Sequence, residues 1–134
     1  MRKIEAILRP DRLHAVQEAL RETGYPGVMV TEMMGHGRQR GGHEHWPEEL
    51  REAYLPKVKL EIVVEEKDQE EVIERIVKAA RTGEMGDGKI FIYEVWDALR
   101  VRTGERGCAA VSTPLPRWVQ QAVKPKKTRA AKKN

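Results

Sequence analysis

The sequence predicts an α+β domain whose elements follow in the order β-α-β-β-α-β. Four segments alternate apolar and polar residues or are rich in β-forming residues, as half-buried strands are. Two further segments repeat apolar residues at helical spacing, and a long connection separates the second strand from the third. This order is that of the ferredoxin-like, split-βαβ plan, in which both helices cover one face of a four-stranded antiparallel sheet. The uncovered face predicts a symmetric oligomer, because a small domain commonly buries such a face against its own copies.

The predicted strands differ in how clearly they alternate. In the first, Ile4, Ala6 and Leu8 fall on one face. The third shows the strongest alternation, with apolar residues at every second position from Val58 to Val64. The second and fourth are rich in residues that favour strands. The four strands are predicted over residues 2–8, 27–35, 57–66 and 89–95.

Helices are predicted between these strands. The first opens at Pro10 and Asp11 and ends at Thr23-Gly24, since proline and glycine are typical of helix starts and ends. The second covers residues 68–81, with acidic residues at its start and a basic end that match the helix dipole. A short helix is predicted inside the long connection, with Pro47 at its first position.

Charge is unevenly distributed along the 134 residues. The formal net charge is +4, but residues 107–134 hold seven Lys or Arg and no acid, which leaves residues 1–106 at −3. Average basicity is therefore weak evidence for a nucleic-acid-binding domain. A flexible, solubilising extension is the favoured interpretation of residues 107–134, with contact to nucleic acid or an acidic partner as the alternative. Within it, Trp118, Val119 and Val123 could anchor the segment 117–124, which lies between prolines.

The chain is predicted to be cytoplasmic. Cys108 is the single cysteine, so no disulfide can form within the chain. No apolar run approaches the roughly 18–20 residues of a membrane span. The N-terminus lacks the apolar core and cleavage site of a signal peptide.

Residues 82–90 (TGEMGDGKI) are the first candidate for chemistry. Three glycines within six residues permit positive φ and close backbone approach, and exposed N–H groups there can bind an anion beside Lys89. The alternative is a helix end followed by a turn, which Thr-Gly and Asp-Gly often form. The spacing of a P-loop is absent.

Two other groups of residues could bind ligands. Arg100 and Arg102, if extended, would point the same way and could grip a polyphosphate, although a solvated edge strand is the simpler interpretation. His36, His43 and His45 could bind a transition metal, but no cysteine lies nearby and the glycines around them suggest mobility.

Five motifs, in order, make the chain resemble a known family. They are KIEAILRP, VTEMMGHGRQRGG, LPKVKLEIVV, ARTGEMGDGKIFIYEV and LRVRTGE, and they cover about residues 1–106. RTGEMGDGKIF and RVRTGE are highly specific in combination. The chain thus resembles the PII nitrogen-regulatory signalling proteins, which are regulators rather than enzymes.

The resemblance implies a compact homotrimer with ligand sites in the clefts between subunits. The family binds ATP or ADP there, and senses 2-oxoglutarate together with Mg-ATP. A "T-loop", here residues 37–55, contacts the regulated transporter or metabolic enzyme, and a "B-loop", here residues 82–89, holds phosphates. The two ligands share one Mg²⁺ ion, so their binding should be coupled.

Carried over motif by motif, the resemblance also implies site residues. Gln39 would help to hold Mg²⁺, Lys57 would pair with a carboxylate of 2-oxoglutarate, and Arg100 and Arg102 would reach the phosphates from a neighbouring subunit. The implied nucleotide site comprises Ile7, Met29, Gly35, Gly37, Arg38, Gln39, Val64, Met85, Gly86, Asp87, Gly88, Lys89, Arg100 and Arg102. The implied 2-oxoglutarate site comprises Gln39, Arg40, Gly41, Lys57 and Gly86.

The sequence departs from the family pattern mainly in the T-loop. The familiar RGAEY-type segment is missing, and Tyr54 stands at the loop's end, so uridylylation is not predicted. Met29 replaces a threonine near the adenine, and His36 replaces an apolar residue. The altered loop tip leaves open a second function, that of a divergent sensor of adenine nucleotides for a dedicated partner other than an ammonium transporter. No Ser-His-Asp or Cys-His set suggests an enzyme, although incidental slow ATP hydrolysis in such a cleft is possible.

Overall fold

The computed structural model describes residues 1–36 and 44–113. Its four-stranded sheet has the order β2-β3-β1-β4, and every neighbouring pair is antiparallel. The predicted ferredoxin-like plan is confirmed. The strands are β1 (Arg2–Leu8), β2 (Val28–Gly35), β3 (Leu55–Val64) and β4 (Lys89–Glu94).

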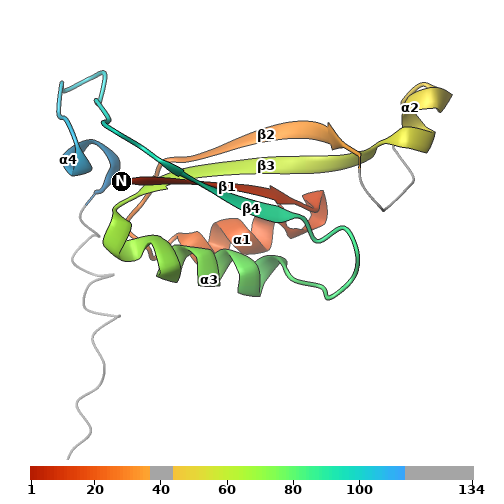
Figure 1. Cartoon of the computed structure of the whole chain (residues 1–134), viewed down its shortest axis with the longest axis horizontal. Coiled ribbons are helices and arrows are strands. Elements are labelled where there is room, and N and C mark those ends of the chain that lie inside the picture. Colours follow the sequence, from red (N-terminus) through yellow and green to blue (C-terminus); the bar gives the residue numbers. More distant parts are fainter. Residues whose placement is uncertain (37–43, 114–134) are drawn as a thin grey trace, which may run out of the picture.

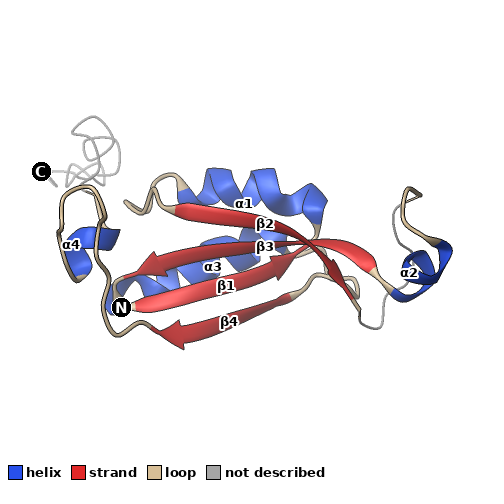
Figure 2. Cartoon of the chain, turned by 90° about the horizontal axis from the view of Figure 1, so that it is seen from above, coloured by secondary structure: helices blue, strands red, loops and turns tan. Residues whose placement is uncertain are grey.

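Two helices cover one face of the sheet, as Figures 1 and 2 show. They are α1 (Leu13–Leu20) and α3 (Gln69–Ala80), which also pack on each other. Each follows a short 3₁₀ turn, η1 (Pro10–Arg12) and η2 (Glu66–Asp68). The regular helices are therefore shorter at their starts than the sequence predicts.

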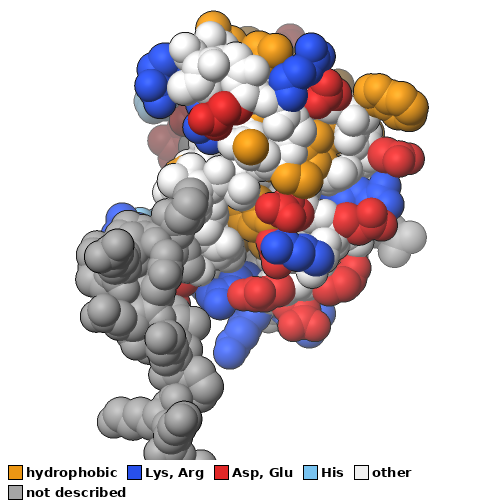
Figure 3. All heavy atoms as spheres, turned by 90° about the vertical axis from the view of Figure 1, so that its left-hand side faces the viewer, with side chains coloured by type: hydrophobic (Ala, Val, Ile, Leu, Met, Phe, Trp, Pro, Cys, Tyr) orange, Lys and Arg blue, Asp and Glu red, His pale blue; other side chains and the backbone are white. Residues whose placement is uncertain are grey.

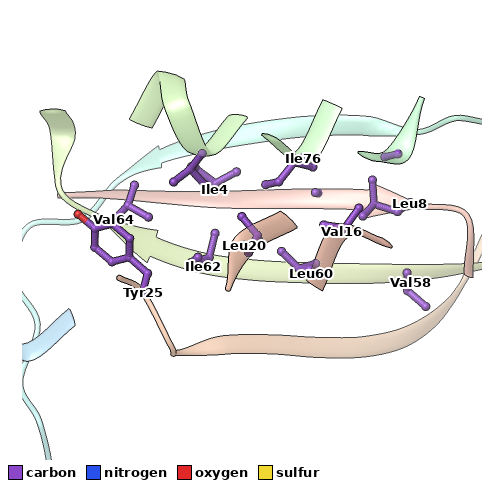
Figure 4. Packing of buried hydrophobic residues seen from close by; sticks show 13 residues of the cluster. Ile4, Leu8, Val16, Leu20, Tyr25, Val58, Leu60, Ile62, Val64 and Ile76 are labelled. Atoms are coloured by element: carbon purple, nitrogen blue, oxygen red, sulfur yellow. The ribbon is translucent and has the colours of Figure 1, made fainter. Parts of the chain in front are cut away.

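The core lies between this face and the two helices (Figure 4). Alternate residues of β1 and β3 point into it, as the period of two in their sequences requires. Tyr25 contributes its ring to the core, and its hydroxyl lies beyond Val64 at the edge of the cluster. That hydroxyl donates to the Asp68 carboxylate and accepts the Glu65 N–H at 3.1 Å.

The third strand begins and ends earlier than its predicted range of 57–66. At its start, Leu55 and Pro56 pair with Gly35 and Met34, because the ladder with β2 continues to the end of that strand. At its end, the Glu65 N–H bonds the Tyr25 hydroxyl instead of a neighbouring strand.

The second face of the sheet carries charged and aromatic side chains. Lys3 lies 3.3 Å from Glu61 and 3.5 Å from Glu5, and its Nζ stands 4.5 Å from the centre of the Tyr93 ring. Within the described ranges, no helix packs on this face (Figure 2).

Two short helices lie beyond the ends of the sheet. The predicted helix in the long connection is present as α2 (Glu48–Ala53), with Pro47 as its N-cap rather than its first residue. At the opposite end lies α4 (Cys108–Val111), which the sequence does not predict (Figure 1). Residues 107–113 thus pack on the domain, although the expected boundary of the extension falls at residue 106.

Figure 3 views the end that carries α4, where hydrophobic atoms lie between acidic and basic side chains. None of the described helices has the length and apolar character that a bilayer crossing requires.

Candidate functional site

The loop of residues 82–89, between α3 and β4, is organised from within by Asp87. The Asp87 carboxylate accepts the N–H groups of Thr82 and Gly83, each at 2.9 Å, and also the Thr82 hydroxyl. These bonds stabilise the ionised carboxylate, and those from Thr82 contribute most to a pKa well below the ordinary value of 3.8. The carboxylate therefore faces the inside of the loop and fixes the shape of its backbone.

Arg9 joins this loop to the end of β1. Its Nε lies 3.1 Å from the Asp87 carboxylate, and its second guanidinium nitrogen donates to the Met85 carbonyl at 2.6 Å. The sequence-based prediction does not include Arg9. The alternation of β1 could have indicated that Arg9 lies near the site. Residues 3, 5, 7 and 9 share the face opposite the core. Leu8 pairs with Val58, which places Arg9 close to Lys57.

Gly88 is required by the close approach of two backbones. It takes φ +101°, and a Cβ there would lie 1.6 Å from the Ile7 carbonyl oxygen. Gly86 also has positive φ, at 100°. Such turns leave backbone N–H groups exposed, which suits an anion.

Lys57 lies beside the same loop. Its Nζ donates to the Gly86 carbonyl at 2.6 Å, and its stem passes Gly35, where a Cβ would come within 3.0 Å of Lys57 Cγ. Burial, and then the nearby Arg9 charge, lower the pKa of Lys57. Lys57 also lines a cavity of about 390 Å³ between β2, β3 and Trp46. A partly desolvated cation of this kind favours a small anionic ligand.

The other predicted residues of the sheet are spread along it. Ile7 lies at the end of β1, opposite Lys89, and Lys89 forms no ion pair within residues 1–36 and 44–113. Met29 lies at the start of β2, opposite Glu61, and is 53% exposed. Val64 pairs with Arg2 at the far end of β1 and is fully buried in the core, so this chain does not expose it to a ligand.

Arg100 lies beside α4, because it donates to the Ala109 carbonyl, and α4 lies at the opposite end of the molecule from the loop between α3 and β4 (Figures 1 and 2). The expectation that Arg100 and Arg102 share an extended segment is wrong, because residues 101–103 form a turn that the Arg100 N–H and carbonyl close. Arg100 pairs with Glu105 at 2.7 Å and donates to the Ala109 carbonyl of α4 at 3.1 Å. Arg102 is exposed, and its side chain forms no hydrogen bond or ion pair with the described part of the chain.

Part of the predicted site lies outside the described residues. This part comprises Gly37, Arg38, Gln39, Arg40 and Gly41, together with His43 of the histidine group. His36 is described, and its ring meets that of Tyr54 edge to face, with centroids 5.8 Å apart. That contact links the last residue before the gap to the residue that precedes β3.

Comparisons with known proteins agree with this arrangement. The family model of nitrogen regulatory protein P-II matches residues 1–105. A P-II protein of Rhodospirillum rubrum is 51% identical over 112 residues, which are all of that protein and 83% of this chain. P-II 1 of Escherichia coli is 46% identical over the same shares. The crystal structure of Arabidopsis thaliana PII bound to citrate has a TM-score of 0.69 and 46% identity, covering 81% of this chain and 90% of that one. The chain therefore belongs to the P-II nitrogen regulatory protein family.

Proposed function

We propose that the chain is a PII-type signal transducer that binds ATP or ADP and senses 2-oxoglutarate in the presence of Mg-ATP. The observation that carries the proposal is the meeting of Lys57, Arg9 and loop 82–89 at one end of the sheet. This end also holds the root of the T-loop, where Gly35 pairs with Leu55. Ligand and partner surfaces would therefore share one structural junction.

The charges at this junction suit a polyanion. The positive charge of Arg9 disfavours the charged form of Lys57. A carboxylate that binds beside both cations would offset this repulsion. A carboxylate of 2-oxoglutarate would take the place of the Gly86 carbonyl as the acceptor of the Lys57 ammonium. Because Gly86 belongs to the loop proposed to hold phosphates, the two ligands would affect each other's binding. The citrate bound to the related Arabidopsis protein is a carboxylate anion, which supports this chemistry.

The Mg²⁺ ion of this proposal would be held by Gln39, which lies outside the described residues. The described part of the chain has no cluster of three His, Cys, Asp or Glu side chains with metal-ligand geometry. In this proposal, oxygens of the nucleotide and of the 2-oxo acid would complete the coordination that Mg²⁺ prefers.

The site would be completed in a homotrimer. The turn that holds Arg100 and Arg102 lies beside α4, at the end of the molecule opposite loop 82–89, so these arginines would serve the site of a neighbouring subunit. The charged and aromatic face of the sheet would supply the contact between subunits.

The T-loop would carry the signal to a transporter or a metabolic enzyme in the cytoplasm. Engagement of its root by ligands would bias the loop between conformations that fit a partner and conformations that do not. Tyr54 is half-buried against His36 beside the sheet, which supports regulation without uridylylation.

Calorimetry tests the proposal. Titrating ATP and ADP with Mg²⁺, with and without 2-oxoglutarate, should show that 2-oxoglutarate tightens ATP binding and leaves ADP binding unchanged. Equal ATP affinity in both conditions would favour the second candidate, a sensor of adenine nucleotides for a dedicated partner other than an ammonium transporter. The presence of α2 in the loop is the observation that favours this candidate, because a helix presents a different docking surface from an extended loop.

A further inference from the structure

A groove of about 630 Å³ lies between the second half of α1 and the segment that leads into β2. Its apolar wall comes from Leu20, Tyr25, Pro26 and Val28, and the groove is also lined by Glu18, which pairs with Arg21 at 3.1 Å. Nothing in the proposed nucleotide or 2-oxoglutarate site uses these residues. The groove has the size that protein grooves offer to side chains or small ligands.

The chain itself leads into this groove. Thr113, the last described residue, lines the groove, and its N–H donates to the Gly24 carbonyl at 3.1 Å. Helix α4 fixes the approach, because the Gly107 N–H bonds the Ala98 carbonyl at 2.9 Å. The described part of the chain therefore ends at the wall of the groove.

The residues that follow have the composition of a docking segment. The stretch PLPRWV, residues 114–119, places Leu115, Trp118 and Val119 among two prolines and one arginine. Proline restricts the backbone, so less conformational entropy is lost on docking, and prolines lack the N–H donors that burial would leave unpaired. Beyond residue 123 the extension is rich in Lys and has no such apolar group.

The extension is also absent from relatives that match along their whole length. Those proteins account for 83% of this chain, and the family model ends at residue 105, so the unmatched part is C-terminal. The segment that directly follows Thr113 is therefore the nearest candidate to occupy the groove.

We propose that residues 114–119 dock into the groove between α1 and β2 of their own chain, with the Trp118 ring and the Leu115 side chain against its apolar wall. Arg117 then lies within reach of the acidic side chain of Glu18. The docked segment holds α4 against the domain, and α4 in turn holds Arg100 through the Ala109 carbonyl. The proposal is independent of which ligands the chain senses.

Fluorescence of the full chain tests the docking. Replacing Trp46 and Trp96 by Phe leaves Trp118 as the single tryptophan, and a synthetic peptide of residues 114–134 gives the exposed reference. Burial of the Trp118 ring should shift its emission to the blue and reduce its acrylamide quenching constant about threefold relative to the peptide. Equal quenching in chain and peptide would refute the proposal.

Substitutions locate the docking site. Gln17→Asp with Pro26→Asp places charge on the groove, and should raise the quenching constant to that of the peptide. Ala15→Asp, on an exposed position of α1 outside the groove, should leave it unchanged. If the groove variant unfolds by circular dichroism, Leu115→Asp gives the same test from the extension, where it cannot disturb the core. If Trp118 is buried and its quenching constant changes in neither the groove variant nor Leu115→Asp, the segment docks elsewhere and the proposal is overturned. If the burial of Trp118 is lost when the protein is diluted, the segment docks into the groove of a second copy, and this result also overturns the proposal.

Discussion

The guanidinium of Arg9 and the carboxylate of Asp87 form an ion pair across 78 residues of sequence, with Nε and Oδ1 3.1 Å apart. Both side chains are largely shielded from solvent, with 19% and 26% of their surfaces exposed. The pair ties the end of β1 to the loop before β4. The shape of that loop therefore depends on a strand end as well as on its own glycines.

Arg9→Ala should weaken nucleotide binding about tenfold, because the loop loses both its ion pair and the bond to the Met85 carbonyl. Arg21→Ala removes an exposed pair with Glu18 on α1 and should leave the affinity unchanged. Calorimetric titration of ATP into both variants makes the comparison. Unchanged affinity in Arg9→Ala would show that the ion pair does not shape the nucleotide site.

Gly88→Ala should destabilise the protein far more than Gly83→Ala. Both residues have positive φ, which costs a non-glycine residue about 1 kcal/mol, but only at Gly88 would the new Cβ meet the Ile7 carbonyl. We expect a loss of about 3 kcal/mol or more in the free energy of unfolding for Gly88→Ala. Urea denaturation of the two variants measures the difference, and equal losses would contradict the close contact.

The contribution of the Asp87 carboxylate to the free energy of unfolding should depend on pH only at acidic pH. Its folded-state pKa lies below the ordinary 3.8, so the ionised carboxylate stabilises the fold above that pH. This contribution is lost as the pH falls through the lowered pKa. The difference in unfolding free energy between the native protein and Asp87→Asn should therefore be constant from about pH 5 to pH 8 and shrink below pH 3.8. Denaturation curves across this range test it, and a change near neutrality would point to another group.

Lys57→Ala should remove the effect of 2-oxoglutarate on ATP binding while ATP alone still binds. The ammonium of Lys57 is the cation at the proposed carboxylate position. Lys59→Ala, two residues along the same face of β3, is the matched control and should keep the coupling. Calorimetry with both ligands distinguishes the variants, and coupling that survives in Lys57→Ala would exclude this role of the lysine.

Tyr25→Phe should lower the free energy of unfolding by about 1–2 kcal/mol, because the Glu65 N–H and the Asp68 carboxylate both lose their partner. Tyr25 is 5% exposed, and burial, followed by its bond to Asp68, raises the pKa of its hydroxyl. Tyr93→Phe removes the hydroxyl of a half-exposed ring and should change stability little. Urea denaturation gives both values, and equal effects would show that the buried hydroxyl contributes nothing.

The strands and main helices could be predicted from the sequence because each buries one regular face. Ile4, Ala6 and Leu8 point into the core as their spacing of two requires. Helix α4 escaped prediction because it has four residues and none is buried, so no periodic pattern marks it.

The site was harder to predict, because its contacts join residues far apart in sequence. The motif around Asp87 indicated a phosphate-binding loop, but not that the carboxylate would bond Thr82 and Gly83 within it. Arg9 belongs to the motif KIEAILRP, but that motif indicated only the family, and it is the register of β1 against β3 that places Arg9 near Lys57. The turn at residues 101–103 depends on bonds between Arg100 and residues 104 and 105, which an i, i+2 spacing of arginines does not reveal.

Loop 82–89 and the Arg100 turn lie at opposite ends of the same chain. In the proposed assembly, a single subunit offers a ligand only one half of a site. The extent of ligand binding would therefore depend on the association of subunits as well as on the ligand concentration. Two variants, one with Arg9→Ala beside loop 82–89 and the other with Arg102→Ala, would each have only weakened sites when pure. Mixed in one trimer, they would regain full affinity at the one site where the intact loop of one subunit meets the intact Arg102 turn of its neighbour.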